Sequence, residues 1–148
     1  MIAVGSSEQP YRKTELFSRS NVWSTEADYP FGDRYFYEYA IVAMNDLFYI
    51  FGGNTFGHGF KTIASFSTIT KDWKKCGKLK QSRYGHSVFI QEGKFVVVGG
   101  GNGIDNFLHT ERCTLKNDNV DCKTIEPTPH DYSLYPEMIA VPYDYCPK

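Results

Sequence analysis

The chain has 148 residues, with 16 lysines and arginines against 17 aspartates and glutamates, and its formal net charge is -1. This length suits a single domain, and the balanced charge argues against nucleic acid or an anionic membrane as a partner, because both favour a strong basic excess. No apolar run approaches the roughly 18 residues of a membrane span, and the N-terminal segment is too short and uncharged for a signal peptide. Aromatic residues make up 16% of the chain, which argues against disorder.

A short apolar run that ends in glycine recurs at a fixed spacing. The run "FYIFGG" ends at Gly53 and "FVVVGG" at Gly100, so the two are 100 − 53 = 47 residues apart. Counting back 47 residues from Gly53 reaches Ser6, which follows the similar run "IAVG". A glycine pair suits a position where backbones crowd or φ is positive. Self-similarity at such a period predicts a repeat fold.

Each copy of this run belongs to a larger predicted unit of four strands. A tyrosine-led strand comes first, at 37–43, 84–90 and 135–141. It is followed by a turn ("MND", "QEG" or "PYD"), the glycine-ended strand, a loop rich in glycine and asparagine, and two more strands. The last strand carries Trp23 or Trp73, and Cys122 takes this place in the third unit. Apolar runs separated by such turns predict β-hairpins, and helical periodicity is absent throughout the sequence.

A glycine pair after an apolar strand, four strands per unit and a tryptophan about 20 residues later resemble the kelch repeat, a blade of a β-propeller. The resemblance implies an all-β kelch-type fold of three blades, at about 1–43, 47–90 and 94–141, with the innermost strands exchanged between the two ends of the chain. Three blades are too few for a closed ring, and an open arc would expose apolar faces. We therefore expect either additional blades in sequence outside this chain or a homodimer closed into six blades by strand exchange.

The four cysteines predict one disulfide. A two-residue turn at Asn117-Asp118 would place Cys113 opposite Cys122 on a non-hydrogen-bonded pair, where side chains approach most closely. That geometry suits a disulfide, which would brace the third blade where tryptophan is missing. The alternative is two free thiols on adjacent strands. For Cys76 and Cys146 a free thiol, an intermolecular bond and a bond to missing sequence all stay open. No C-x-x-C motif or histidine cluster predicts a metal site.

Kelch propellers typically bind partners on one face, formed by the loop after the glycine pair and the loop before the innermost strand. The resemblance implies partner-binding candidates in these loops: Arg34, Asn54, His58, Arg83, Tyr84 and Asn102. Arginine beside aromatic residues is typical of interface hot spots, and a solvated charge at the rim is the alternative. Turn chemistry is the competing interpretation for the asparagines. For Tyr84 the competing interpretation is a packing role, because a tyrosine recurs at the equivalent place in every unit.

The sequence thus predicts a non-enzymatic binding scaffold, extracellular and without a cofactor, that presents propeller loops to a protein or glycan partner. Two alternatives stay open. One is a cytoplasmic kelch substrate adaptor, and the other is a copper oxidase of the galactose-oxidase type. No catalytic residue is predicted, because GxSxG, HExxH and P-loop motifs are absent from the sequence. No N-x-Ser/Thr sequon is present either, so the usual glycan mark of secretion is missing.

Overall fold

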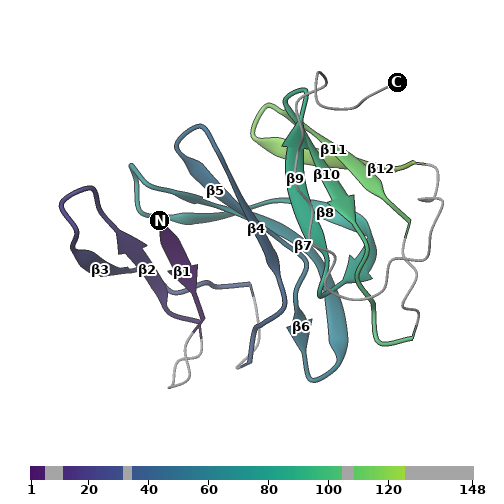
Figure 1. The fold of residues 1–148 in the computed structure, drawn as a ribbon, viewed down its shortest axis with the longest axis horizontal. Helices are drawn as coiled ribbons and strands as arrows, with labels where there is room; N and C mark the ends of the chain where they lie inside the picture. Colours follow the sequence, from purple (N-terminus) through teal and green to yellow (C-terminus); the bar gives the residue numbers. More distant parts are fainter. Residues whose placement is uncertain (6–11, 32–34, 105–108, 126–148) are drawn as a thin grey trace, which may run out of the picture.

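The structure is a computed structural model that describes residues 1–5, 12–31, 35–104 and 109–125. In these ranges the chain is all β, with strands, turns and no helix (Figure 1). None of the described residues therefore forms a helix that could cross a membrane. The predicted last strand at 135–141 lies outside the described residues, as do Arg34 and Cys146. The exchange of innermost strands and the blade limits stay predictions.

The first part of the chain forms a small antiparallel sheet, which we call unit 1. Its strands are β1 (Ile2–Val4), β2 (Thr14–Phe17) and β3 (Trp23–Glu26), in the order β1-β2-β3. The register places Val4 opposite Thr14 and Phe17 opposite Trp23. The apolar run before Gly5 is thus a strand, as the sequence predicts.

Two four-stranded antiparallel meanders follow, and their strands come in the order that the repeat predicts. Unit 2 consists of β4 (Ala40–Met44), β5 (Leu47–Phe51), β7 (His58–Ser67) and β8 (Trp73–Arg83), and the short β6 (Asn54–Thr55) pairs with the start of β7. Unit 3 consists of β9 (Ser87–Gln91), β10 (Lys94–Val98), β11 (Glu111–Lys116) and β12 (Asn119–Thr124). The predicted "MND" and "QEG" turns form hairpins, in which Asn45 and Glu92 adopt the positive φ that such turns need.

The tyrosine-led strands begin later than the sequence pattern predicts. Tyr37 and Tyr84 form only isolated bridges, each with the loop that follows the glycine pair. The backbone then bends at Glu38 (φ 56°) and Gly85 (φ 59°) before β4 and β9 begin. A positive φ lies outside the β region and interrupts a strand. The two tyrosines therefore belong to the loops at the end of each unit and not to the main ladder.

Units 2 and 3 pack face to face around the larger core of the described chain. Its buried side chains are Tyr49, Phe51, Ile63, Cys76, Leu79, Phe95, Val97, Cys113, Val120 and Cys122. At the rim of this core β8 and β12 run parallel, and Gly77 pairs with Val120. A Cβ on Gly77 would lie 2.4 Å from the Val120 carbonyl oxygen, so only glycine permits this close approach.

The glycine pair of unit 2 lies where the backbone enters unit 3. Gly52 has a φ of 58°, and a Cβ on it would lie 2.4 Å from the carbonyl oxygen of Arg83. The N–H of Gly53 donates a hydrogen bond to the same oxygen at 2.9 Å. The glycines are therefore required where the next unit crosses, which is the physical reason for their recurrence in the sequence.

A second core, rich in aromatic side chains, joins unit 1 to unit 2. Its buried members are Val4, Tyr29, Phe36, Ile50 and Ala64. The ring of Tyr29 stacks on Phe36 with centroids 4.5 Å apart, and it meets Trp73 edge-on at 5.0 Å. Both arrangements are favourable for aromatic rings. The segment between units 1 and 2 thus supplies much of the packing that holds them together.

Candidate functional site

The loops before β4 and after β10 meet the β6–β7 turn at one end of units 2 and 3, in the lower part of Figure 1. The Thr55 hydroxyl donates to the Tyr35 carbonyl oxygen. A Cβ on Gly103 would lie 2.4 Å from the Gly57 carbonyl oxygen, so the loop after β10 touches the β6–β7 turn. We call the exposed side chains of these segments the loop edge, and they are Tyr35, Tyr37, Phe56, His58 and Ile104.

The loop edge exposes large apolar side chains. Phe56 is 68% exposed and Ile104 is 92% exposed. The ring of Phe56 meets that of Tyr35 edge-on, with centroids 5.1 Å apart. Phe56 also has a φ of 50°, which is uncommon for a bulky residue and costs free energy. Apolar side chains gathered at a surface in this way mark interaction sites.

The structure brings Asn54, His58, Tyr84 and Asn102 to this same end of the molecule. Asn54 is buried, and its Nδ2 donates to Glu38 Oε2 at 2.8 Å. His58 is exposed at the start of β7, and Tyr84 is half-buried. Asn54 therefore stabilises the bend before β4, while His58 is open to solvent. Their predicted roles in partner binding stay predictions.

Asn102 shapes the loop that carries Ile104. Its side-chain oxygen accepts a hydrogen bond from the Ile104 N–H at 2.8 Å. Such a turn, closed by an asparagine side chain, is the ordinary use of this residue in loops. The structure thus supports the interpretation of Asn102 as a turn residue. The turn that its side chain closes presents the Ile104 side chain to solvent.

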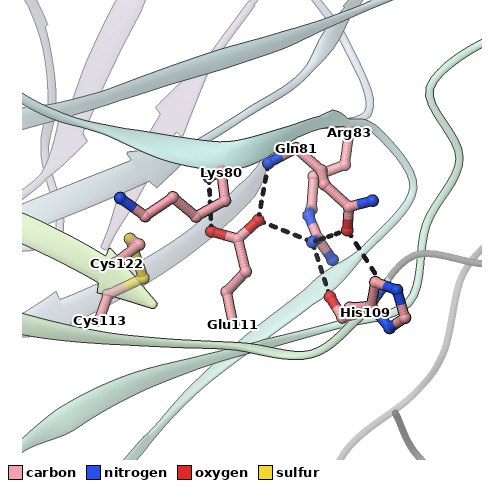
Figure 2. Close-up of a disulfide and its surroundings, with 7 residues drawn as sticks. All are labelled: Lys80, Gln81, Arg83, His109, Glu111, Cys113 and Cys122. Atoms are coloured by element: carbon pink, nitrogen blue, oxygen red, sulfur yellow. Dashed lines mark hydrogen bonds and ion pairs between the residues drawn. A yellow bond between two sulfur atoms is a disulfide. The ribbon is translucent and has the colours of Figure 1, made fainter. Parts of the chain in front are cut away.

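Arg83 is not an exposed rim charge but the centre of a buried network (Figure 2). Its side chain is 0% exposed, and a guanidinium nitrogen lies 2.8 Å from Glu111 Oε1. The same guanidinium donates to the carbonyl oxygens of Gly99 at 2.9 Å and His109 at 2.8 Å. These two carbonyls belong to the ends of the loop after β10, so Arg83 holds that loop closed. Its contact with a partner stays untested, and its observed bonds are internal.

The Glu111 side chain is buried to the same degree as that of Arg83. Its carboxylate accepts the backbone N–H groups of Lys80 at 2.7 Å and Gln81 at 3.0 Å, in addition to the Arg83 bond. Burial lowers the pKa of Arg83, and the charge and hydrogen bond of Glu111 raise it in part. A buried charge is tolerated only when its partner and hydrogen bonds are complete. The network therefore ties β8 of unit 2 to β11 of unit 3.

His86 is a second buried polar residue beside this network. Neither ring nitrogen has a hydrogen bond of ordinary geometry in the described ranges, although the Phe51 backbone lies close enough to act as a weak partner. Burial, and secondly the positive charge of Arg83, lower the pKa of His86 to about 3. The folded protein therefore holds this imidazole neutral, because both causes disfavour its charged form.

One group of potential metal ligands exists in the described ranges, formed by Glu111, Cys113 and Cys122. Cys113 and Cys122 form the predicted disulfide, with Cα atoms 4.0 Å apart and directly opposite in register. The Glu111 oxygens are already engaged, so this group offers no free ligand atoms for a metal. Cys76 is a buried free cysteine. Burial raises its pKa to about 11, so it is a poor nucleophile at neutral pH.

Sequence reasoning missed three exposed residues of the loop edge, Tyr35, Phe56 and Ile104. Phe56 and Ile104 each adjoin a glycine of the loop after a glycine pair. An apolar residue beside glycine in a turn has no strand neighbour to cover it, and this was the available signal. The buried acid Glu111 was also missed, because its partner lies 111 − 83 = 28 residues away along the chain.

Removing the charge of Arg83 tests the buried network. We expect Arg83→Met to lower the free energy of unfolding by about 3–5 kcal/mol, because it leaves the Glu111 carboxylate buried without its cation. The double variant Arg83→Met/Glu111→Gln is expected to recover about half of that loss, because no isolated charge remains. Chemical denaturation followed by circular dichroism measures both. A loss below about 1 kcal/mol for the single variant would contradict the network's role.

The lowered pKa of His86 predicts a pH-dependent stability. The unfolded chain protonates this histidine below its ordinary pKa of 6.5, whereas the folded protein does not until about pH 3. The contribution of neutral His86 to the free energy of unfolding is therefore complete above pH 6.5 and is lost as the pH falls. We expect the free energy of unfolding to decrease by about 2 kcal/mol between pH 7 and pH 5 from this cause. Denaturation of the wild type and His86→Gln at both pH values measures this difference. An equal pH dependence in the two proteins would show that His86 is not responsible.

Comparison with known proteins identifies the fold alone. No family model matches the sequence, and no curated protein matches it significantly. Among solved structures, the fold resembles that of YjhT, a kelch-repeat propeller protein, with a TM-score of 0.61 and 17% sequence identity. The match covers 79% of this chain and 45% of that chain, so this chain spans less than half the length of YjhT. The described all-β units are thus similar to part of a kelch propeller.

Proposed function

We propose that units 1, 2 and 3 are blades of a kelch-type β-propeller, and that the protein is a binding scaffold which holds a protein partner at the loop edge. The observation that carries this proposal is the exposed Tyr35–Phe56 ring pair, together with Ile104 on the loop that touches the same turn. These side chains are 40%, 68% and 92% exposed, in the order named. Leaving so much apolar surface in water costs free energy, and a partner that covers it recovers this cost.

The repeated construction of the units supports the propeller part of the proposal. Each of units 2 and 3 has four strands in an antiparallel meander, and adjacent units pack through their apolar faces. In β-propellers the loops at the ends of the strands carry binding residues on a rigid scaffold. The loop edge is such an end. The loop after β10 is held at both of its ends by the Arg83 network, which reduces the entropy lost on binding.

A protein partner fits the loop edge better than a glycan. Phe56 and Ile104 offer apolar surface, and Ile104 has no ring on which a sugar could stack. Aromatic and aliphatic side chains at the centre of a contact, with polar groups around them, are typical of protein interfaces. His58 and the Tyr37 hydroxyl can supply that polar rim. Binding of a glycan instead of a protein is one possible result of the binding experiment described below.

The Cys113–Cys122 disulfide supports an extracellular location. Disulfides persist in oxidising compartments and are rare in the cytoplasm. This one lies in the core between units 2 and 3, where both cysteines are almost fully buried. A protein that used these positions as free thiols would lose the cross-link between β11 and β12. We therefore place the binding scaffold outside the cell, and a cytoplasmic adaptor is the rival.

Substitutions at the loop edge test the binding site. We expect Phe56→Ser and Ile104→Ser each to reduce capture of the partner by about 30-fold, the scale of a hot-spot residue, without loss of the fold. The matched control is Ile69→Ser, since Ile69 is 74% exposed in the turn between β7 and β8 and is no part of the loop edge. The measurement is quantitative mass spectrometry of proteins captured by each variant, with a glycan array run in parallel. Equal capture by all variants would refute the loop edge as the site.

The state of the cysteines in native material tests the compartment. Alkylation before reduction, followed by peptide mapping, is expected to find Cys113 joined to Cys122 and protected from the reagent. Buried Cys76 is expected to be alkylated only after unfolding, because its thiol is covered and its pKa is about 11. Alkylation of both Cys113 and Cys122 in the unfolded, unreduced protein would overturn the extracellular location and favour the cytoplasmic adaptor.

A further inference from the structure

A cleft lies between units 2 and 3 at the end of their strands that is opposite the loop edge, and we call it the junction cleft. Its volume is about 330 Å³. It is lined by the start of β5, the end of β7, the start of β8 and the β11–β12 turn. Because β5 runs from this end toward the glycine pair and the β6–β7 turn, the junction cleft and the loop edge are separate surfaces. The residues that line the cleft all belong to the described ranges.

The size of the side chains at this junction accounts for the cleft. Phe66 and Trp73 face each other on the last two strands of unit 2, and Trp73 packs toward unit 1, where its Nε1 donates to the Thr14 hydroxyl at 3.1 Å. In unit 3 these positions are occupied by Cys113 and Cys122, which pack toward unit 2. A disulfide fills much less space than a phenyl and an indole ring, and a close-packed interior does not adjust freely to fill the difference. We attribute the cleft to this replacement.

Tyr49 forms the floor of the junction cleft. It is 1% exposed, and its ring packs on Phe95 with centroids 4.8 Å apart. Its hydroxyl lines the cleft and forms no hydrogen bond to another described residue. Burial is the main cause that raises the pKa of Tyr49, so the hydroxyl keeps its proton at neutral pH. The floor therefore offers a fixed and unused hydrogen-bond donor.

A second donor comes from the turn between β7 and β8. Ser67 Oγ accepts the backbone N–H groups of Ile69 at 3.3 Å and Thr70 at 3.1 Å. These two bonds occupy both lone pairs of the oxygen and fix its position, so the proton of the Ser67 hydroxyl is what this group has left to offer. Ser67 lines the junction cleft. Its hydroxyl is therefore a fixed donor in the wall, as that of Tyr49 is in the floor.

Two carboxylates and one ammonium group stand at the mouth of the junction cleft. Lys74 Nζ lies 3.4 Å from Asp118 Oδ2, and this ion pair joins β8 of unit 2 to the β11–β12 turn of unit 3. The side-chain carboxylate of Asp72 has no hydrogen bond or ion pair to another described residue. The mouth thus carries one unpaired negative charge among the described residues, together with acceptor oxygens that are open to a ligand.

This set of groups fits a neutral ligand with many hydroxyl groups better than it fits an ion. An anion would be repelled by the carboxylates of Asp72 and Asp118. An organic ammonium ion has no acceptor atom, so it would leave the hydroxyl donors of Tyr49 and Ser67 without a partner. Each hydroxyl of a sugar, in contrast, donates to a carboxylate and accepts from a hydroxyl or an ammonium group. The apolar side chain of Leu47, which also lines the cleft, suits the C–H groups of a sugar ring.

We propose that the junction cleft binds a sugar, either a free monosaccharide or the terminal residue of a glycan chain. Asp72 and Asp118 accept hydrogen bonds from the sugar hydroxyls, and Tyr49 and Ser67 donate to its oxygens. The volume of the cleft lies at the lower end of the range for ligand pockets, which suits a small ligand. The site is separate from the loop edge and does not rest on the partner proposed there.

Titration of the isotope-labelled chain with small sugars, followed by NMR, tests the site. The probes are D-glucose, D-galactose, D-mannose and N-acetyl-D-glucosamine, and the methyl glycoside of each, in which the anomeric hydroxyl is blocked as it is in a glycan chain. We expect at least one probe to shift the amide signals of Tyr49, Ser67 and Asp118. Binding of free sugars alone supports a monosaccharide ligand, and binding of methyl glycosides as well supports the end of a glycan. A chain that binds none of these probes would overturn the proposal.

Two variants test the named contacts. Tyr49→Phe removes only the hydroxyl and keeps the ring on Phe95, and it is expected to weaken sugar binding by about fivefold. Asp72→Asn removes the charge of the unpaired carboxylate and is expected to weaken sugar binding by about tenfold. Neither side-chain group that is changed bonds to another described residue, so thermal unfolding is expected to stay as in the wild type. Sugar affinity that is unchanged in both variants would refute these contacts.

Matched controls separate the junction cleft from other surfaces. Tyr37→Phe on the loop edge and Asp121→Asn on β12 make the same chemical changes elsewhere and are expected to leave sugar binding unchanged. Putrescine and sodium sulfate are the cationic and anionic probes, and tighter binding of either one than of every sugar would overturn the ligand class. Phe56→Ser tests partner capture and is expected to leave sugar binding intact, so the two proposals fail separately. Sugar binding that is lost in Phe56→Ser but kept in Tyr49→Phe would place the sugar at the loop edge and overturn the junction cleft as its site.

Discussion

The buried ion pair between Arg83 and Glu111 is the interaction on which the arrangement of units 2 and 3 depends. Both side chains are 0% exposed, so neither charge can be stabilised by water and each requires the other. Arg83 closes the loop after β10, and Glu111 fixes the backbone of β8 through two N–H groups. One pair of charges thus sets the packing of two units and the position of the loop that carries Ile104.

The equivalent positions at the junction between units 1 and 2 show that the fold does not itself demand the charges. Counting back 47 residues from Arg83 and Glu111 reaches Phe36 and Ala64, and both of these are buried in the core between units 1 and 2. An aromatic ring and a methyl group fill the space there. The facing residues on the last two strands of each unit vary in the same way, because the Cys113–Cys122 disulfide of unit 3 occupies the position of Phe66 and Trp73 in unit 2. Each junction therefore keeps its backbone geometry and changes its chemistry, and the residues on the two sides change together.

The sequence was sufficient for the features that repeat and insufficient for those that occur once. The glycine pairs, the hairpin turns and the cross-strand position of Cys113 and Cys122 follow from local patterns, and the structure confirms them. The ion pair could not be foreseen, because Arg83 and Glu111 meet only after two units have packed. The exposure of Phe56 was hidden for the opposite reason: an aromatic residue in a strand-rich chain is normally counted toward the core, and only the positive φ of its turn directs it outward.

This division between repeated and single features also supports the loop edge as the proposed binding site. Tyr37 and Tyr84 recur at equivalent places and form equivalent bridges, so each contributes to the construction of its unit, and the predicted role of Tyr84 in partner binding stays a prediction. Among the described residues, Phe56 and Ile104 have no such counterpart in contact or exposure. Selection for folding alone gives no reason to expose them, because each leaves apolar area in water without packing in return. A fold shared by many functions acquires a particular one through its loops, and in this chain the described loops depart from the repeat at two highly exposed apolar residues.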